Sequence, residues 1–136
     1  MAREVVTRSA DETRALGREL GSGLARGDVL LLEGELGSGK TTFVKGLAEA
    51  CKVAVMVRSP TFALMHRYRG DPDLVHVDLY RESDAAGLED LYLEADGDRV
   101  ITVVEWPKEL APYLWPDAPR VLFEHVDETT RRILLP

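Results

Sequence analysis

The sequence predicts an α/β fold, in which helices pack on a mixed parallel and antiparallel sheet. Two continuous apolar runs of strand length, "DVLLLE" (28–33) and "RVITVVE" (99–105), are typical of strands buried on both faces. Helical patterns alternate with strand patterns early in the chain and hairpin patterns come late, which together favour an α/β sandwich. The length of 136 residues fits one domain, 1–136.

The first third of the chain alternates strands with helices. A short strand is expected at 4–7. The pattern "SADE" is a capping box, so we expect a helix from Ser9 to about Ala25 that stops at Gly27. After the first apolar run comes a glycine-rich loop, and an apolar stripe then predicts a second helix over 41–51.

The remaining chain predicts two hairpins on either side of a buried strand. The turn signal "GDPD" joins strands at 61–70 and 74–80, and the rough alternation in the second of these indicates a less buried strand than 99–105. We also expect a helix over 83–93, a turn at 96–98, a short helix that can begin only at Pro107, and a final hairpin of strands at 120–126 and 130–135.

The composition favours a cytoplasmic protein that does not cross a membrane. No apolar run approaches the roughly 20 residues that a membrane-spanning helix needs. The start "MAREVVTRSADE" lacks the apolar region of a signal peptide. The single cysteine, Cys51, cannot form an internal disulfide, which fits a reducing compartment.

Charge and residue types exclude other classes of function. The formal net charge of −7 argues against direct nucleic-acid binding, which needs a basic surface, so any nucleic acid is expected to be held by a partner. His66, His76 and His125 show no metal-ligand spacing among themselves or with Cys51. We therefore interpret these four residues as structural.

A glycine-rich loop, "GELGSGKTT" at 34–42, is the first candidate site. It matches the pattern G-x-x-x-x-G-K-[ST], and a buried strand before it and a helix after it give the expected context. Glycines allow the backbone N–H groups to converge on an anion at a helix N-terminus. The alternative is a strand–helix turn that only resembles such a loop. The predicted phosphate-binding residues are Glu35, Leu36, Gly37, Ser38, Gly39, Lys40, Thr41 and Thr42.

Two acidic residues at strand ends are candidates to complete this site. Lys40 would reach the terminal phosphates and the Thr41 hydroxyl would bind Mg²⁺, which keeps several waters and needs few protein ligands. Because its strand is expected to be central and next to the strand before the loop, we assign Glu105 to Mg²⁺ and Asp78 to the attacking water. The alternative for each is a solvated carboxylate.

Missing residue types indicate which nucleotide the loop would bind. The chain has no Gln, which excludes the amide that positions water in many GTPases, and no Asn, which excludes the guanine-reading pattern N-K-x-D. Adenine is therefore favoured over guanine. Thr61 in "RSPTF" is a candidate sensor of the γ-phosphate, and a proline turn that opens a strand is the alternative.

Four motifs in this order and spacing, "GELGSGKTTF", "SPTF", "HVDLYR" and "VVEWP", resemble the TsaE family over roughly residues 5–126. This family comprises small bacterial P-loop ATPases needed to make threonylcarbamoyladenosine in tRNA. The resemblance implies a three-layer α/β fold of the P-loop NTPase kind with a mixed sheet. It also implies ATP at the glycine loop and Mg²⁺ at Thr41 and Glu105.

The resemblance further implies roles in turnover for Thr61, Asp78 and Trp106, and an adenine position near the start of the first helix, at Ala10. It implies an accessory ATPase that acts with the proteins TsaB and TsaD and meets tRNA only through that complex. Two alternatives are a small-molecule P-loop kinase and a binding module that needs ATP but not its hydrolysis.

Overall fold

The computed structural model describes residues 3–35, 37–55, 57, 65–78, 97–105 and 115–136. Its strands and helices are, in chain order, β1 (Arg3–Thr7), α1 (Ala10–Gly21), β2 (Val29–Gly34), α2 (Lys40–Ala50), β3 (Met65–Tyr68), β4 (Leu74–Asp78), β5 (Ile101–Glu105), β6 (Arg120–His125) and β7 (Arg131–Leu135). A 3₁₀ turn covers Gly97–Arg99 and overlaps the turn predicted at 96–98.

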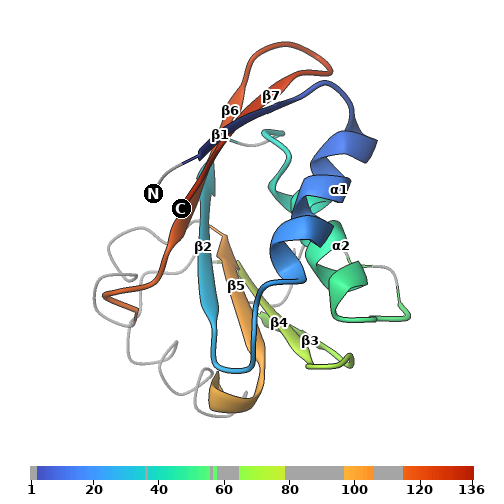
Figure 1. Cartoon of the computed structure of the whole chain (residues 1–136), viewed down its shortest axis with the longest axis vertical. Coiled ribbons are helices and arrows are strands. Elements are labelled where there is room, and N and C mark those ends of the chain that lie inside the picture. Colours follow the sequence, from blue (N-terminus) through green and yellow to red (C-terminus); the bar gives the residue numbers. More distant parts are fainter. Residues whose placement is uncertain (1–2, 36, 56, 58–64, 79–96, 106–114) are drawn as a thin grey trace.

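The seven strands form one mixed sheet in the order β1-β7-β6-β2-β5-β4-β3 (Figure 1). Strand β2 is parallel to both of its neighbours, β5 and β6, and β4 is parallel to β5. Strands β3 and β4 pair antiparallel, as do β6 and β7, and β1 pairs antiparallel with β7. The predicted α/β class, the mixed sheet and both hairpins are confirmed.

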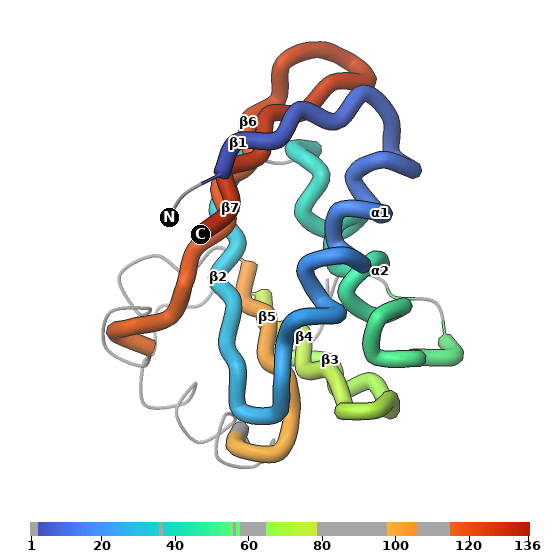
Figure 2. The backbone as a smooth tube through the Cα atoms, in the orientation of Figure 1, coloured from blue at the N-terminus to red at the C-terminus, as the bar shows by residue number. Residues whose placement is uncertain are grey.

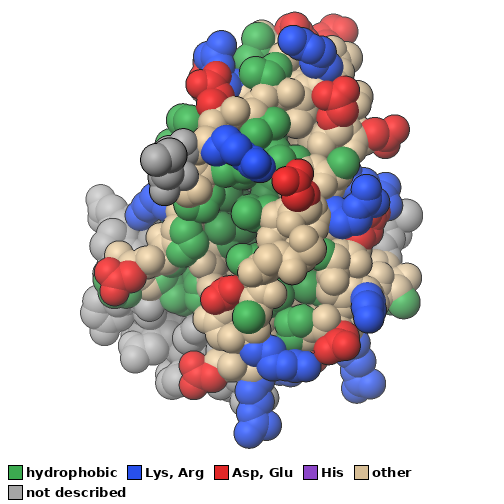
Figure 3. Space-filling model, viewed as in Figure 1, with side chains coloured by type: hydrophobic (Ala, Val, Ile, Leu, Met, Phe, Trp, Pro, Cys, Tyr) green, Lys and Arg blue, Asp and Glu red, His purple; other side chains and the backbone are tan. Residues whose placement is uncertain are grey.

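Both described helices cover the same face of the sheet (Figure 2). On this face Leu30 and Leu32 of β2 pack with Phe43 and Leu47 of α2 in the main core, whereas Leu31 points into a smaller cluster on the other face. A space-filling view shows hydrophobic side chains gathered between the strands and the helices, with charged side chains around them (Figure 3). Strand β2 is therefore buried on both faces, as its continuous apolar run predicts.

The two helices approach each other closely because glycines face each other at their crossing. A Cβ atom on Gly17 of α1 would collide with the carbonyl oxygen of Phe43, and one on Gly46 of α2 would collide with the carbonyl oxygen of Arg14. Only glycine leaves room for this backbone contact. The crossing fixes α1 over the first turns of α2, next to the glycine-rich loop.

One expectation about these elements is wrong, and another holds only in part. Helix α1 ends at Gly21 rather than near Ala25, because the C-cap residue Ser22 donates its hydroxyl to the Glu19 carbonyl oxygen at 2.7 Å and the next N–H groups bond only three residues back. Strand β5 is buried throughout, whereas β4 is buried from Leu74 to Val77 and partly exposed at Asp78, so β4 is less buried than β5 only at its end. Its polar residue His76 faces the protein interior and is completely buried.

Some predicted elements lie outside the described residues. These are the helix over 83–93, the short helix from Pro107 and the first part of the strand at 61–70. Within the described part of the chain, no helix combines the length and the apolar character needed to cross a membrane.

Candidate functional site

The glycine-rich loop connects the end of β2 to the start of α2 in a conformation that needs its glycines. Gly37 and Gly39 have φ angles of 76° and 103°, where other residues are strained. A Cβ on Gly34 would lie 2.8 Å from the Phe123 carbonyl oxygen, so the loop starts pressed against β6. A Cβ on Gly37 would meet nothing within 4 Å, so this side of the loop is open.

The loop has hydrogen-bond donors that suit an anion. The first N–H groups of any α-helix lack partners within the helix. Gly39 is the N-cap of α2 and supplies no side chain to accept them. The Ser38 hydroxyl is also buried without a hydrogen-bond partner in the described structure. These donors fit a phosphate group at the positive end of the α2 dipole.

Lys40 is buried between the loop and the ends of two strands. Its side chain is only 5% exposed, and its Nζ donates to the carbonyl oxygen of Gly34. Burial lowers the pKa of the Lys40 amine, and the negative charges of Glu105 and Asp78 act in the opposite direction. The lysine therefore shares one electrostatic site with both predicted carboxylates.

Glu105 and Asp78 end two adjacent parallel strands. They are register partners across β5 and β4, and Leu32 of β2 is the register partner of Glu105 on its other side. Glu105 is 3% exposed, whereas Asp78 is partly exposed. Ligands commonly bind at the carboxyl ends of parallel strands in α/β proteins, and the loop lies at this same edge. The predicted central position of the Glu105 strand, next to β2, is confirmed.

His76 is a residue of this site that the sequence interpretation missed. It lies two residues before Asp78, so both side chains are on the same face of β4. Its Nε2 donates to Oε2 of Glu105, while its Nδ1 is buried without a hydrogen-bond partner in the described structure. A polar residue two positions before Asp78, in an otherwise apolar strand, is the signal that could have indicated His76.

Arg131 at the start of β7 is a second missed residue. Its Cγ would lie 3.7 Å from a Cβ on Gly39, and the Thr13 methyl of α1 would lie 3.5 Å from the same point. Carbonyl oxygens of Asp127 and Thr130 accept from its Nη1 at 2.6 and 3.0 Å. Local sequence gives no signal for this residue, because β7 meets the loop only through the order of strands in the sheet.

The structure thus brings most predicted residues to one edge of the sheet. Glu35 is exposed at the start of the loop, Thr41 and Thr42 are in the first turn of α2, and Ala10 is exposed at the start of α1. Leu36, Thr61 and Trp106 lie outside the described residues. No group of three or more His, Cys, Asp and Glu side chains in the described part of the chain is placed to hold a metal ion. Mg²⁺ needs only one or two protein ligands, because it takes its other ligands from phosphates and water.

Comparison with known proteins identifies the family. The family model for "Threonylcarbamoyl adenosine biosynthesis protein TsaE" matches residues 7–133. The chain belongs to the TsaE family. TsaE from Mycobacterium tuberculosis is 41% identical over 133 residues, which cover 90% of this chain and 79% of the relative. The resemblance drawn from the four motifs is therefore confirmed.

Other TsaE relatives and a solved structure agree. TsaE from Aquifex aeolicus is 41% identical over 115 residues, covering 82% of each chain, and TsaE from Bacillus subtilis is 35% identical over 131 residues, covering 93% of this chain and 80% of the relative. The crystal structure of Bacillus subtilis YdiB superposes with a TM-score of 0.83 at 28% identity, covering 99% of this chain and 84% of that chain. The P-loop NTPase-like fold expected for a TsaE protein is confirmed.

Proposed function

We propose that this chain binds ATP with Mg²⁺ at the 34–42 loop, hydrolyses it, and thereby supports threonylcarbamoyladenosine formation in tRNA. Membership of the TsaE family supports the place in tRNA modification. The observation that carries the ATPase proposal is the meeting of Lys40 with Glu105 and Asp78 at the carboxyl ends of adjacent strands. A loop with unpartnered donors beside one buried cation and two carboxylates suits a metal-bound polyphosphate.

Each side chain has a distinct role in this proposal. The loop N–H groups and the Lys40 ammonium bind phosphate oxygens, where charge-assisted hydrogen bonds are strongest. Glu105 and the Thr41 hydroxyl hold Mg²⁺. When bound, this ion neutralises charge on the phosphate oxygens. The more exposed Asp78 orients the attacking water and accepts its proton, because it lies beside Glu105 and remains accessible to solvent.

Thr61 and Trp106 keep the roles in turnover that the family resemblance gives them, as part of the same proposal. Because the chain is acidic, we propose that tRNA is bound by a partner, the complex of TsaB and TsaD. Hydrolysis would then drive repeated cycles of that complex. A kinase would need a binding site for a phosphoryl acceptor in addition to this site, so the two reactions differ in whether turnover requires an added acceptor.

The variant Asp78→Ala tests the proposal, because it separates binding from hydrolysis. We expect it to retain ATP binding, to lose ATP hydrolysis, and to fail to support tRNA modification in a reconstituted assay with TsaB and TsaD. Full modification by a variant that no longer hydrolyses ATP would favour an ATP-dependent binding module. Hydrolysis that requires an added small-molecule acceptor would favour a kinase instead.

Co-purification with TsaB and TsaD, with and without ATP, tests the partner assignment separately. We expect ATP to change how much of this chain is retained by the pair. Glu33→Ala is a suitable control, because Glu33 pairs with Arg120 on the sheet and lies outside the loop. Retention that is independent of nucleotide in both proteins would argue against an ATP-controlled association.

A further inference from the structure

We propose that His76 is a positioning residue: it holds one oxygen of the Glu105 carboxylate so that the other oxygen faces the metal site. The inference rests on the proposed function, since it concerns how the same site binds Mg²⁺. Its starting point is the contact of Nε2 of His76 with Oε2 of Glu105. These atoms belong to residues 29 positions apart, on adjacent parallel strands.

The sheet register makes this contact a fixed one. His76 is the register partner of Val103, and Asp78 is the register partner of Glu105. Because side chains alternate along a strand, all four point to the face that carries α2. His76 is therefore the diagonal neighbour of Glu105, one pair further from the open edge, and reaches its carboxylate from the interior side.

Burial indicates that the contact has a function. His76 is 0% exposed, and burying a polar ring in a core costs free energy unless its nitrogens are paired. Its Nδ1 has no partner in the described structure, so Glu105 is the hydrogen-bond partner that the described residues give the ring. An apolar side chain would fill this position in β4 without that cost. The contact calls for a proton on Nε2, because an ionised Glu105 carboxylate can only accept and a proton on Nδ1 would have no acceptor among the described residues.

Without His76, the Glu105 carboxylate would have a different preferred partner. Lys40 lies close enough to influence and be influenced by its charge. A carboxylate freed from Nε2 can rotate toward that ammonium, which would use the oxygen needed for the metal. Hydrogen bonds from a second residue commonly fix the orientation of metal-binding carboxylates, and their loss weakens metal binding by roughly 10- to 100-fold.

Two amide variants separate the position of the N–H group from polarity in general. The side-chain nitrogen of Gln can replace Nε2 of histidine in reach, whereas that of Asn is closer to the backbone and replaces Nδ1. We expect His76→Asn to raise the Mg²⁺ concentration needed for tight binding of a fluorescent ATP analogue by roughly 10- to 100-fold. His76→Gln should restore the wild-type midpoint. Both should leave binding in EDTA unchanged, because the loop and Lys40 are intact.

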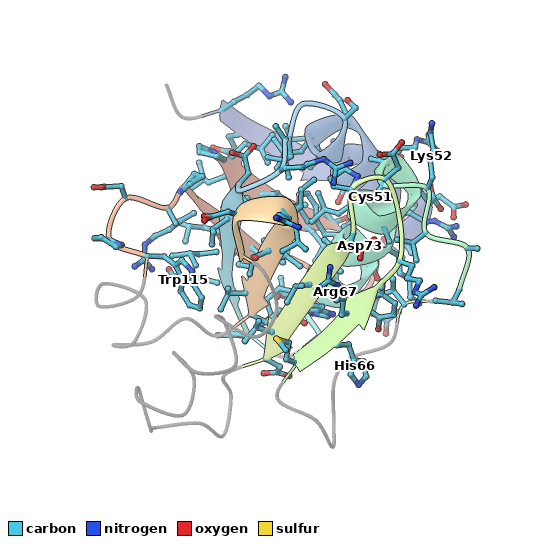
Figure 4. The ribbon with its side chains drawn as sticks, turned by 90° about the horizontal axis from the view of Figure 1, so that it is seen from below. Cys51, Lys52, His66, Arg67, Asp73 and Trp115 are labelled. Carbon is cyan, nitrogen blue, oxygen red and sulfur yellow. The ribbon has the colours of Figure 1, made fainter. Side chains whose placement is uncertain are left out.

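His66→Gln is the matched control. His66 is the register partner of His76 on the edge strand β3, where its ring contacts the Tyr68 hydroxyl at 3.2 Å (Figure 4). Its Mg²⁺ midpoint should equal that of the wild type. Equal midpoints for His76→Asn and the wild type, or a His76→Gln midpoint as high as that of His76→Asn, would overturn the inference.

A second measurement does not depend on nucleotide. Nitrogen-15 NMR of the unliganded protein should show a His76 ring with its proton on Nε2, and Glu105→Ala should abolish that fixed form. A proton on Nδ1 in the wild type would overturn the inference. Failure of the wild type to bind the ATP analogue would instead refute the proposed function, whereas a raised Mg²⁺ midpoint in Glu105→Ala but not in His76→Asn would refute the role of His76 alone.

Discussion

The carboxyl ends and the amino ends of the parallel strands lie at two opposite edges of the sheet. These two edges hold their charged side chains in different ways. At the edge where β2, β5 and β4 end, Lys40 and Glu105 are 5% and 3% exposed. At the opposite edge, Arg26 and Asp71 form an ion pair of 3.2 Å whose side chains are 58% and 70% exposed. The β3–β4 turn at that edge carries a second pair, Arg67 with Asp73 at 3.0 Å (Figure 4).

This difference in burial distinguishes charged groups that can take part in chemistry from charged groups that only lie on the surface. Exposed ion pairs contribute about 0–1 kcal/mol to stability. Buried charges cost several kcal/mol of desolvation each, which mutual attraction seldom exceeds, so they are weak contributors to stability. Buried, closely spaced charges are therefore functional candidates, and among the described residues Lys40 and Glu105 are such charges beside the glycine-rich loop.

The largest expected effect is that of Lys40→Ala on nucleotide binding. In the proposed site the change would remove charge-assisted hydrogen bonds to phosphate, each contributing about 1.5–3 kcal/mol, so with two such bonds the affinity for Mg-ATP should fall by about 100-fold or more and turnover should be lost. Isothermal titration calorimetry and a phosphate-release assay measure the two effects. Wild-type affinity in this variant would place the phosphate site elsewhere.

Arg26→Ala is the matched control for Lys40→Ala, because it removes a cation from the opposite edge. It should leave Mg-ATP affinity unchanged and shift the free energy of unfolding by about 0.5 kcal/mol or less. A clear loss of affinity in this control would mean that the two edges do not differ in the way their burial indicates.

The next effect concerns how the backbone supports the buried edge. Gly46→Ala places a methyl group against the Arg14 carbonyl oxygen, so we expect it to lower the free energy of unfolding by about 1–3 kcal/mol. In an exposed helix the same change would stabilise by about 1 kcal/mol. Urea unfolding followed by circular dichroism gives the value.

Gly23→Ala is the control for this glycine effect. A Cβ on Gly23 would lie 3.6 Å from the Leu20 carbonyl oxygen, an ordinary contact. Its unfolding midpoint should stay close to that of the wild type. Stabilisation by Gly46→Ala would show that α1 and α2 can separate, and would remove the close crossing as the reason for glycine there.

Local patterns predicted the parts of the fold that depend on neighbours in sequence. The apolar runs of β2 and β5 gave two central strands, and the capping box gave the start of α1 at Ser9, whose hydroxyl accepts the Glu12 N–H at 3.1 Å. The end of α1 was misplaced because the Ser22 hydroxyl donates to the Glu19 carbonyl oxygen at 2.7 Å and caps the helix there. Spacing of apolar residues carries no information about such a competing hydrogen bond.

The candidate site was likewise predicted where it depends on local sequence and missed where it depends on the arrangement of strands in the sheet. The glycine pattern identified the loop, and two carboxylates at strand ends were enough to select Glu105 and Asp78. His76 was interpreted as structural because it shows no metal-ligand spacing, and local spacing carries no information about its contact with a carboxylate on the next strand. Arg131 comes to Gly39 through a strand order that no local pattern contains.

The smallest expected effect tests the exposed edge through pH. The Gly70 N–H, bonded at 3.0 Å, is the main cause that holds the pKa of Asp73 below its ordinary value of 3.8, and Arg67 adds to it. Because the folded pKa is lower than the unfolded one, the stabilisation is complete above pH 3.8 and is lost as the pH falls through the folded value.

Asp73→Asn isolates this contribution, because the amide keeps an acceptor for Gly70 but has no charge to titrate. The variant should be less stable than the wild type by about 1 kcal/mol or less at neutral pH, and the difference should shrink as the pH falls below 3.8. Urea midpoints measured between neutral and acid pH give the comparison. A difference that grows toward acid pH would mean that the Asp73 carboxylate is destabilised in the folded protein. The charges of the exposed edge would then lower the stability of the fold, as the buried charges do.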